Sequence, residues 1–206
     1  MSVLLDPRHF PAYNQLPSDD GYLYTDFFEL HGNIYKPSHD WCFMGEIVDD
    51  SLATIPFLRH RLVVKDKEGT EIVVSFYLSP GDILDTSLLS VGNTIFVRYA
   101  EQHFFMDGTQ GLRIENTALI YVVPLSLSTI CSAHRAVTPN KCMECGSQAK
   151  QICAKCKQAY YCTRKCQVDN WSVHRSICHV LTLVAPVTFK ENRFKSHIHT
   201  PLSNIY

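Results

Sequence analysis

The chain has 206 residues, 46% of them hydrophobic, which suits one ordinary domain with a buried core and one small additional module. Its formal net charge is only −1, but residues 1–140 carry 9 Lys and Arg against 17 Asp and Glu, whereas residues 141–180 carry 7 against 2. We find no secretion signal and no apolar run near the roughly 18–20 residues that span a bilayer, so we expect an intracellular protein of the nucleus or the cytoplasm, without a membrane partner.

Residues 1–40 form the first segment and are rich in proline and aromatic residues, as in FPAYNQLPSDDGYLYTDFFELHGNIYKPSHD. We expect this segment to wrap along the following domain as an ordered extension and not to fold as a separate unit. The composition changes at Trp41.

Residues 41–124 contain five runs rich in Val, Ile, Phe and Tyr: WCFMGEIVDD, LRHRLVVKDKEG, TEIVVSFYL, NTIFVRYAEQHFFMDG and LRIENTALIYVVP. Such runs, bounded by Asp, Gly, Asn or Pro, predict β-strands. The KEGT turn between the second and third runs predicts a hairpin. Between the third and fourth runs, a short helix starting near Asp82 and ending before Gly92 is predicted by the apolar residues Ile83, Leu84, Leu88 and Leu89.

Five strands with a helix between the third and fourth is the element order of an OB-fold, a small, partly open Greek-key barrel. We therefore predict a mainly β fold, with an OB-like five-stranded barrel and one helix at residues 41–124. Another small β-barrel and a β-sandwich fragment remain alternatives, because the prediction uses element order and no residue signature.

Barrels of this kind often bind single-stranded nucleic acid with a basic groove and stacking aromatic residues. The aromatic residues are present, although a barrel core needs such residues as well: Phe76, Tyr77, Phe96, Tyr99, Phe104 and Phe105. Residues 1–140 total −8 and repel phosphate overall. A local basic patch could still form from Arg59, Arg61, Lys65 and Arg98. Single-stranded nucleic-acid binding by the barrel is therefore the alternative function.

Residues 125–140 show little periodicity and separate the acidic body from a basic, cysteine-rich segment. We expect them to be a linker. At the other end of the chain, residues 181–206 form a tail with enough apolar residues to dock on the body, for example as a strand.

Residues 141–180 hold seven of the nine cysteines, in the spacing Cys-x2-Cys-x7-Cys-x2-Cys-x5-Cys-x3-Cys-x7-His-x3-Cys. In a reducing compartment, dense cysteines indicate a metal more often than disulfides. Neighbouring ligands two or three residues apart can reach one ion, and eight ligands complete two tetrahedra, which suits zinc. Closed shells leave no position for water or substrate, so we expect two structural zinc ions.

The eight ligands can be paired sequentially or in an interleaved way. Interleaving cross-links the whole segment and replaces a core that some forty residues cannot supply, so we favour it, although spacing alone does not prove it. It places Cys142, Cys145, Cys162 and Cys166 on one zinc and Cys153, Cys156, His174 and Cys178 on the other. We expect His179 to be an exposed residue near a helix end, and Cys42 and Cys131 to be small buried apolar residues.

The landmarks YYC before the fifth ligand, CQ at the sixth, and W..H...C at the end resemble a MYND-type zinc finger over residues 142–178. A RING-type finger is the rival, but RING modules usually place a His in the middle of the ligand order, whereas here the only ligand His is seventh. The MYND resemblance implies the interleaved ligand set, a short hairpin and a helix that carries the last ligands. It also implies binding of short proline-containing peptides by strand addition, with Gln167 and Trp171 lining a groove beside the strand of Tyr160 and Tyr161. Position 154, where some peptide-binding members have a hydroxyl, is Ala here.

The sequence contains no phosphate-binding Gly-rich loop, no nucleophile elbow and no HExxH helix. Some MYND proteins are lysine methyltransferases, but the hallmarks of their SET domain are missing, which leaves an unfamiliar methyltransferase as a distant alternative. We therefore expect a non-enzymatic adaptor. Its finger would dock proline-containing peptides of partner proteins, in transcriptional or ubiquitin-linked complexes as the resemblance suggests.

Overall fold

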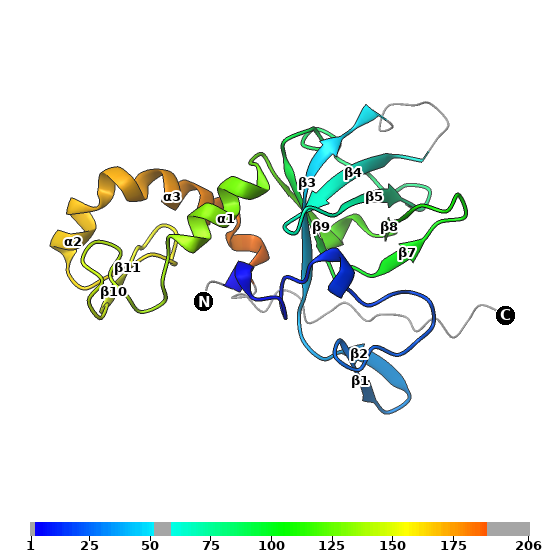
Figure 1. Ribbon diagram of the computed structural model, residues 1–206, viewed down its shortest axis with the longest axis horizontal. Coiled ribbons are helices and arrows are strands. Elements are labelled where there is room, and N and C mark those ends of the chain that lie inside the picture. The colour runs from blue at the N-terminus through cyan, green and yellow to red at the C-terminus, as the bar shows by residue number, and fades with distance from the viewer. Residues whose placement is uncertain (1–2, 52–58, 189–206) are drawn as a thin grey trace.

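The computed structural model describes residues 3–51 and 59–188 (Figure 1). Seven strands form one sheet in the order β7-β8-β5-β4-β3-β6-β9. Their bounds are Cys42–Asp49 (β3), Arg61–Asp66 (β4), Glu71–Phe76 (β5), Thr94–Arg98 (β6), Gln102–Phe104 (β7), Gln110–Ile114 (β8) and Ile120–Val123 (β9). The β5–β8 pair is parallel, and the other pairs in this sheet are antiparallel. The prediction of a mainly β fold is confirmed.

The sheet closes on itself because β6 and β7 are halves of one bent strand. Only residues 99–101 join them, yet β6 pairs with β3 and β7 pairs with β8 near the opposite end of the sheet. Tyr99 makes the bend with a φ of 50°. Its hydroxyl donates to Asp40, and the indole Nε1 of Trp41 donates to Ala100 O at 2.9 Å, so buried contacts hold the bend. With β6 and β7 counted together, the barrel wall consists of β3, β4, β5, β8 and this bent strand.

The hairpin predicted at KEGT joins β4 to β5. The Asp66 carboxylate accepts hydrogen bonds from the backbone N–H groups of Glu68 and Thr70, each at 2.9 Å. Gly69 supplies the positive φ of 89° that this turn requires.

The prediction of a short helix at residues 82–91 is wrong, because these residues form irregular structure with turns at 87–88 and 91 and a bend at 90. In this stretch, side chains form hydrogen bonds with nearby backbone groups: Asp82 accepts from Ser79 N, and Asp85 accepts from Ser87 N. Such short-range bonds compete with a helical ladder. The fifth run also forms two strands, β8 and β9, which lie apart in the sheet and are separated by a 3-10 turn at Thr117–Leu119.

The N-terminal segment contains the 3-10 turns Val3–Leu5 (η1) and Tyr13–Gln15 (η2) and a hairpin of Phe28–His31 (β1) and Ile34–Pro37 (β2). Leu4 and Phe10 belong to one buried cluster, and Tyr13 and Leu16 belong to another, inside the barrel. The hairpin projects from the body (Figure 1).

The segment 125–140, expected as a linker, contains a helix, Leu127–Arg135 (α1), and the chain ends its described part with helix Trp171–Leu183 (α3) and the 3-10 turn Ala185–Val187 (η5). Ser126 caps α1 by accepting from Thr129 N. The residues of the expected tail after 188 lie outside the described residues.

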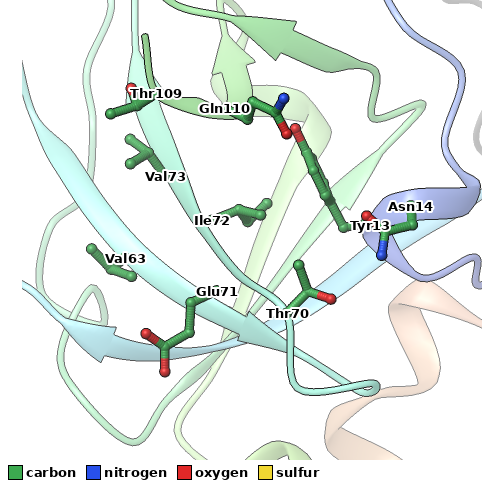
Figure 2. Close-up of a pocket in the computed structure, with 9 residues that line it drawn as sticks. All are labelled: Tyr13, Asn14, Val63, Thr70, Glu71, Ile72, Val73, Thr109 and Gln110. Carbon is green, nitrogen blue, oxygen red and sulfur yellow. The ribbon is translucent and has the colours of Figure 1, made fainter. Parts of the chain in front are cut away.

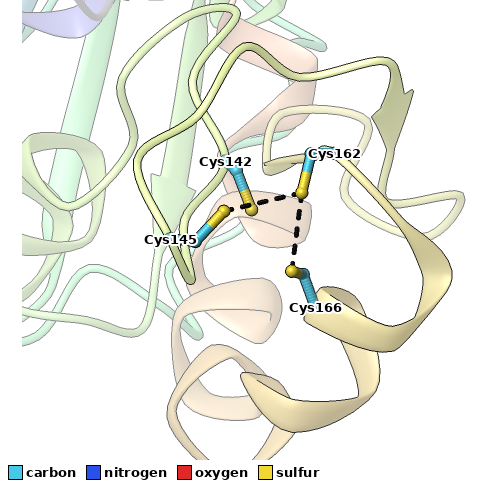
Figure 3. A group of neighbouring side chains, drawn as sticks. All are labelled: Cys142, Cys145, Cys162 and Cys166. Atoms are coloured by element: carbon cyan, nitrogen blue, oxygen red, sulfur yellow. Dashed lines mark hydrogen bonds between the residues drawn. The ribbon is translucent and has the colours of Figure 1, made fainter.

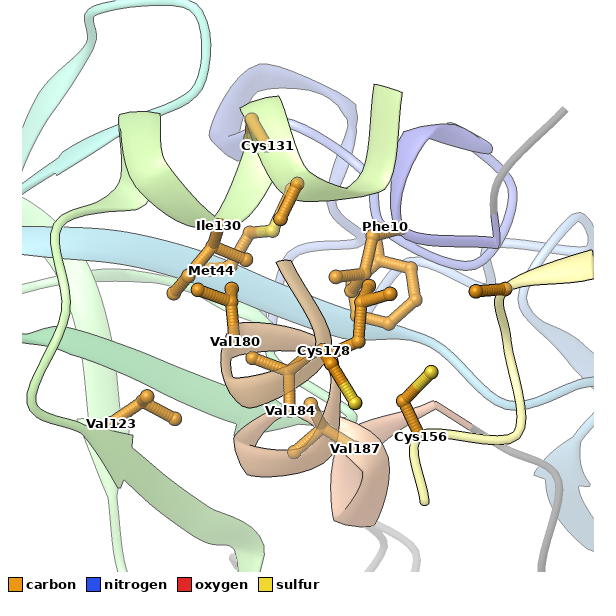
Figure 4. Packing of buried hydrophobic residues seen from close by; sticks show 14 of the residues in the cluster. Phe10, Met44, Val123, Ile130, Cys131, Cys156, Cys178, Val180, Val184 and Val187 are labelled. Atoms are coloured by element: carbon orange, nitrogen blue, oxygen red, sulfur yellow. The ribbon is translucent and has the colours of Figure 1, made fainter. Parts of the chain in front are cut away.

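Helices α1 and α3 cover the outer face of the barrel at β3 and β6. Successive side chains of a strand point to opposite faces, so Phe43 fills the barrel while Met44 points outward under the helices. Phe96 of β6 lies in the same outer cluster. Figure 4 shows Met44 beside Ile130 of α1 and Val180 of α3. The barrel and the C-terminal segment therefore share one apolar core.

Candidate metal centres

Two similar backbone turns present the first two cysteine pairs. Gly146 N donates to Cys142 O at 2.9 Å, and Lys157 N donates to Cys153 O at 2.8 Å. In each turn the residue after the second cysteine has a positive φ, 73° for Gly146 and 55° for Lys157. Each turn therefore directs two thiols toward the same point.

The remaining ligand candidates come from the two helices of the segment. Thr163 caps helix Arg164–Asp169 (α2) by accepting from Cys166 N, which places Cys162 just before the helix and Cys166 in its first turn. His174 and Cys178 lie four residues apart in α3 and therefore on one face. A short hairpin, Gln151–Ile152 (β10) and Tyr160–Tyr161 (β11), holds the second turn between its strands and leads into α2.

The structure gathers the eight side chains into two groups, in which all candidate ligand atoms lie within 4.8 Å of one another. The groups are Cys142, Cys145, Cys162 and Cys166, and Cys153, Cys156, His174 and Cys178. In the first group, Cys162 Sγ lies 3.5 Å from both Cys145 Sγ and Cys166 Sγ (Figure 3). This is the interleaved grouping.

The distances suit tetrahedral zinc. A Zn–S bond of about 2.3 Å places tetrahedral sulfurs roughly 3.8 Å apart. In the second group, Cys153 Sγ and Cys178 Sγ are 3.9 Å apart, and Cys156 Sγ lies 3.8 Å from His174 Nε2. All nine cysteines are free thiols, so the crowding is not that of disulfides. The two clusters fit two structural zinc ions.

The two groups differ in burial. All four members of the second group are buried, whereas only Cys142 is buried in the first. Burial lowers the pKa of His174, which favours the neutral imidazole that binds a metal. Burial, followed by the charges of Cys156 and Cys153, raises the pKa of Cys178 to about 12. Crowded thiols of this kind become thiolates when a divalent cation is bound, because its charge compensates theirs.

This geometry defines a small zinc finger with two interleaved tetrahedral sites. Comparison with protein families matches residues 142–178 to the MYND finger family, so this part of the chain is a MYND finger.

The matches with related proteins cover short parts of both chains. A zinc finger MYND domain-containing protein 10 homolog of Drosophila melanogaster is 42% identical over 41 residues, 20% of this chain and 9% of that protein. Tudor domain-containing protein 1 of Mus musculus is 46% identical over 37 residues, 18% of this chain and 3% of that protein. Histone-lysine N-methyltransferase SMYD3 of Mus musculus is 34% identical over 58 residues, 28% of this chain and 13% of that protein.

The four residues expected at a peptide groove have different surroundings. Trp171 is 45% exposed and packs edgewise on the His174 ring, while Gln167 and Tyr160 are half-buried. Tyr161 is fully buried, and its hydroxyl donates to Asn170 Oδ1 at 3.1 Å. Tyr161 therefore packs the interior of the finger.

Two exposed apolar residues adjoin this region and were missed by the sequence analysis: Ile152 of β10 and Val168 of α2, 43% and 61% exposed. The helical spacing of Val168 and Trp171 could have indicated a shared face. Strand β11 is hydrogen-bonded on both sides, since Met143 N donates to Tyr160 O and Lys150 N donates to Tyr161 O. Cys153 N bonds to Ala159 O, so the alternation of an antiparallel pair directs the backbone groups of Ile152 outward. The free edge is therefore that of β10.

The four basic residues proposed for a patch on the barrel do not form one. Arg98 is buried and donates to Pro186 O at 2.7 Å. Arg61 pairs with Asp107, and Lys65 pairs with Glu71. The Arg59 guanidinium lies 3.8 Å from the centre of the Tyr77 ring, and the Arg113 guanidinium lies 4.6 Å from it, so this ring already has cationic partners.

Of the aromatic residues expected in the barrel core, Phe76 and Tyr99 lie in the cluster inside the barrel, Phe96 is buried in the outer cluster under the helices, Phe105 is buried, and Phe104 is exposed. A hollow of about 300 Å³ opens beside Tyr13 and Gln110 (Figure 2). Its lining includes the carboxylate of Glu71 and no Lys or Arg, so it does not attract phosphate.

No helix within residues 3–51 and 59–188 is both long and apolar enough to cross a bilayer.

Proposed function

We propose that the protein is a non-enzymatic adaptor whose MYND finger docks proline-containing peptide segments of partner proteins. The observation that carries the proposal is the free edge of β10, together with the exposed apolar side chains on β10, α2 and the start of α3. An extended peptide would add to β10 through backbone hydrogen bonds and place alternate side chains against Ile152 and Trp171.

The structure supports different roles for the residues implied by the resemblance. Trp171 and Gln167 would face the peptide, and Tyr160 and Tyr161 would hold the hairpin from the inner side. The zinc ions would be bound by the eight clustered side chains and would give the finger its shape. Four protein ligands complete each shell, which supports a structural role for the metals.

The nine free thiols are consistent with a reducing compartment, and we place the protein in the nucleus or the cytoplasm. The similarity to a histone-lysine N-methyltransferase covers the finger and 28% of the chain, which supports a shared binding module and not a shared reaction. Incorporation of a methyl group from S-adenosylmethionine into histone or peptide substrates would contradict the non-enzymatic assignment.

Fluorescence anisotropy tests the docking. The probes are labelled peptides with the core Pro-Ala-Leu-Ala-Pro, whose alternate residues can face the groove, and with neutral, acidic or basic flanks. Trp171→Ala should weaken binding at least about tenfold, because an aromatic anchor is lost, and should leave two equivalents of zinc. Val173→Ala is the matched control, since Val173 is 59% exposed on another face of α3. Failure of all three peptides to bind the unaltered protein would overturn the proposed function.

Single-stranded nucleic-acid binding by the barrel is the second candidate and has less support, because Arg61 and Lys65 are paired with carboxylates and Arg98 is buried. A labelled single-stranded oligonucleotide titrated across a salt series tests it. Micromolar binding that weakens steeply with salt would reverse the ranking.

A further inference from the structure

The cations of the finger lack carboxylate partners, unlike several cations of the barrel. Within the described residues, no ion pair involves any of the Lys and Arg side chains of residues 141–180, whereas Arg61, Lys65 and Arg113 of the barrel are each paired. The unpaired side chains are Lys141, Lys150, Lys155, Lys157, Arg164, Lys165 and Arg175. All seven are exposed.

The finger has only two carboxylates to balance these cations. Glu144 accepts a hydrogen bond from Asn170 Nδ2 at 3.0 Å, and Asp169 is exposed at the end of α2. Seven cations against two carboxylates leave +5, and seven thiolates with two zinc ions bring the total to about +2. The thiolate charge lies with the metals, so the outer surface is positive.

We call the three exposed apolar residues Ile152, Val168 and Trp171 the apolar strip, and several of these cations flank its members along the sequence. Asn170 joins α2 to α3 with helical φ and ψ of −79° and −7°, so helical spacing continues across the junction. Arg164 lies one turn before Val168, and Arg175 lies one turn after Trp171.

On the strand side of the strip, Lys150 directly precedes β10 and Lys155 follows it within the second cysteine turn. A peptide added to the β10 edge would therefore meet cations at both ends of its apolar core.

We propose that the segment bound by the finger carries carboxylate side chains, Asp or Glu, on both sides of its proline-containing core. This inference rests on the proposed docking function. A protein segment fits better than nucleic acid, because the strip offers apolar contact and a strand edge, and because the body of the chain at −8 repels a long polyanion. Charge complementarity of this kind selects among partners and speeds their association.

The test compares the three labelled peptides that share the core Pro-Ala-Leu-Ala-Pro. We expect the acid-flanked peptide to bind roughly five- to tenfold more tightly than the neutral one at about 50 mM salt, and the basic-flanked peptide to bind most weakly. The differences should shrink toward zero at about 500 mM salt, because the cations are exposed and screened.

Charge-reversed variants identify the cations responsible. The double variant Lys150→Glu, Arg175→Glu should remove the preference for acidic flanks while retaining two zinc equivalents. If that variant loses zinc, Lys150→Glu, Arg164→Glu serves instead. Lys36→Glu is the control, because Lys36 is an exposed cation on β2, outside the finger, and its reversal should leave the preference unchanged.

The possible outcomes separate the two proposals. Equal binding of the three peptides at low salt, or an unchanged preference in the double variants, would overturn the acidic-partner inference and leave the docking function standing. Failure of all three to bind would overturn both. Displacement of the acidic peptide by a single-stranded oligonucleotide at lower concentration would identify nucleic acid as the partner of this surface instead.

Discussion

At the scale of single residues, two aromatic side chains of the finger have opposite surroundings. Trp171 is 45% exposed, whereas Tyr161 is fully buried and its hydroxyl bonds to Asn170, whose own amide donates to Glu144. The exposure of Trp171 therefore suits the binding role proposed for it, and the surroundings of Tyr161 suit a structural role. The MYND resemblance implied both residues at the peptide site, with Trp171 lining the groove and Tyr161 on the adjacent strand, and the sequence does not show which of the two is buried.

Tyr161→Phe tests this distinction. The substitution keeps the ring but leaves the buried amide of Asn170 without one partner, which should reduce the free energy of unfolding by about 1–2 kcal/mol. Urea unfolding of the zinc-loaded protein measures this, and peptide binding at a temperature well below the transition should be unchanged. Loss of peptide binding at unchanged stability would instead place Tyr161 in the groove.

Glu101, in the bend between β6 and β7, predicts a pH dependence. Burial, and secondarily the charge of Asp19, raises its pKa from the ordinary 4.5 to about 7. The folded protein therefore holds a proton between these values that the unfolded chain has released, so stability falls as the pH rises from about 4.5 to about 7 and stays lower above it. Glu101→Gln should consequently stabilise the protein at pH 8 by about 1–3 kcal/mol.

Thermal unfolding at about pH 8 and about pH 5.5 measures the effect of Glu101→Gln, which should be clearly smaller at the lower pH. Glu68→Gln is the control, because Glu68 is exposed in the β4–β5 turn and its replacement should act equally at both values. A gain from Glu101→Gln that is equal at both pH values would show that the buried charge is not its cause.

At the scale of elements, the finger could be predicted from the sequence because the spacing of its cysteines and histidine identifies them as metal ligands. The grouping of the eight ligands follows from four short-range pairs, each set by a tight turn or a helical turn. The free edge of β10 could not be predicted in the same way, because it depends on the hydrogen bond from Met143 N to Tyr160 O, two residues that lie apart in the sequence.

The helices of the body were harder to predict than its strands. The runs that form β3, β4, β5 and β6 are long and rich in β-branched residues, so the prediction that they are β-strands was correct. Helix α1 was missed although Leu127, Ile130 and His134 recur at helical spacing, because its stretch is short and rich in Ser and Thr. Residues 82–91 satisfied the apolar spacing of a helix, but Asp82 and Asp85 bond to nearby backbone instead.

The parallel pair β5–β8 depends on Gly111. A Cβ atom at this position would lie 1.8 Å from Val73 O, and the clash is with backbone and cannot be relieved by a rotamer change. Gly111→Ala should therefore separate the two strands and destabilise the barrel by about 3 kcal/mol or more, in the range of severe single substitutions.

Circular dichroism and thermal unfolding compare Gly111→Ala with Gly81→Ala. Gly81 has a φ of 100° and nothing within 4 Å of an added Cβ, so its replacement introduces backbone strain alone, of about 1 kcal/mol. Equal losses in the two variants would mean that the strands adjust to the added methyl group.

At the scale of the whole molecule, the finger is joined to the barrel by a shared core and not only by the chain. The outward faces of β3 and β6 pack against α1 and α3, and Cys156 and Cys178 lie in the same cluster (Figure 4). Tyr121 of β9 donates to Leu183 O at 3.0 Å, and Leu127 N donates to Glu46 of β3 at 2.9 Å. Length and composition could not predict this packing of the finger against the barrel. The strand runs of the barrel and the ligand spacing of the finger can each be recognised without reference to the other.

The shared core makes the two zinc sites unequal in their effect on the rest of the molecule. Figure 1 shows β10, β11 and α2 at the end remote from the barrel, with α1 and α3 between them. Three cysteines of one site, Cys153, Cys156 and Cys178, are buried in the shared core, whereas the other site contributes only Cys142 to its buried residues and Cys145 is exposed. Loss of the zinc site that contains Cys178 would disturb the packing of α3 on β3. Loss of the zinc site that contains Cys145 would disturb the outer end of the finger.

Cys178→Ser and Cys145→Ser test this difference. Each should lower the zinc content measured by elemental analysis, because one ligand of a tetrahedral shell is weakened. Only Cys178→Ser should also destabilise the barrel, by about 3 kcal/mol or more, since it disrupts a buried core that both modules share. The chain has two tryptophans, so in a Trp171→Phe background the fluorescence of buried Trp41 reports the barrel alone. An unchanged Trp41 transition in Cys178→Ser would show that the barrel is stable without the finger and that the shared core contributes little to it.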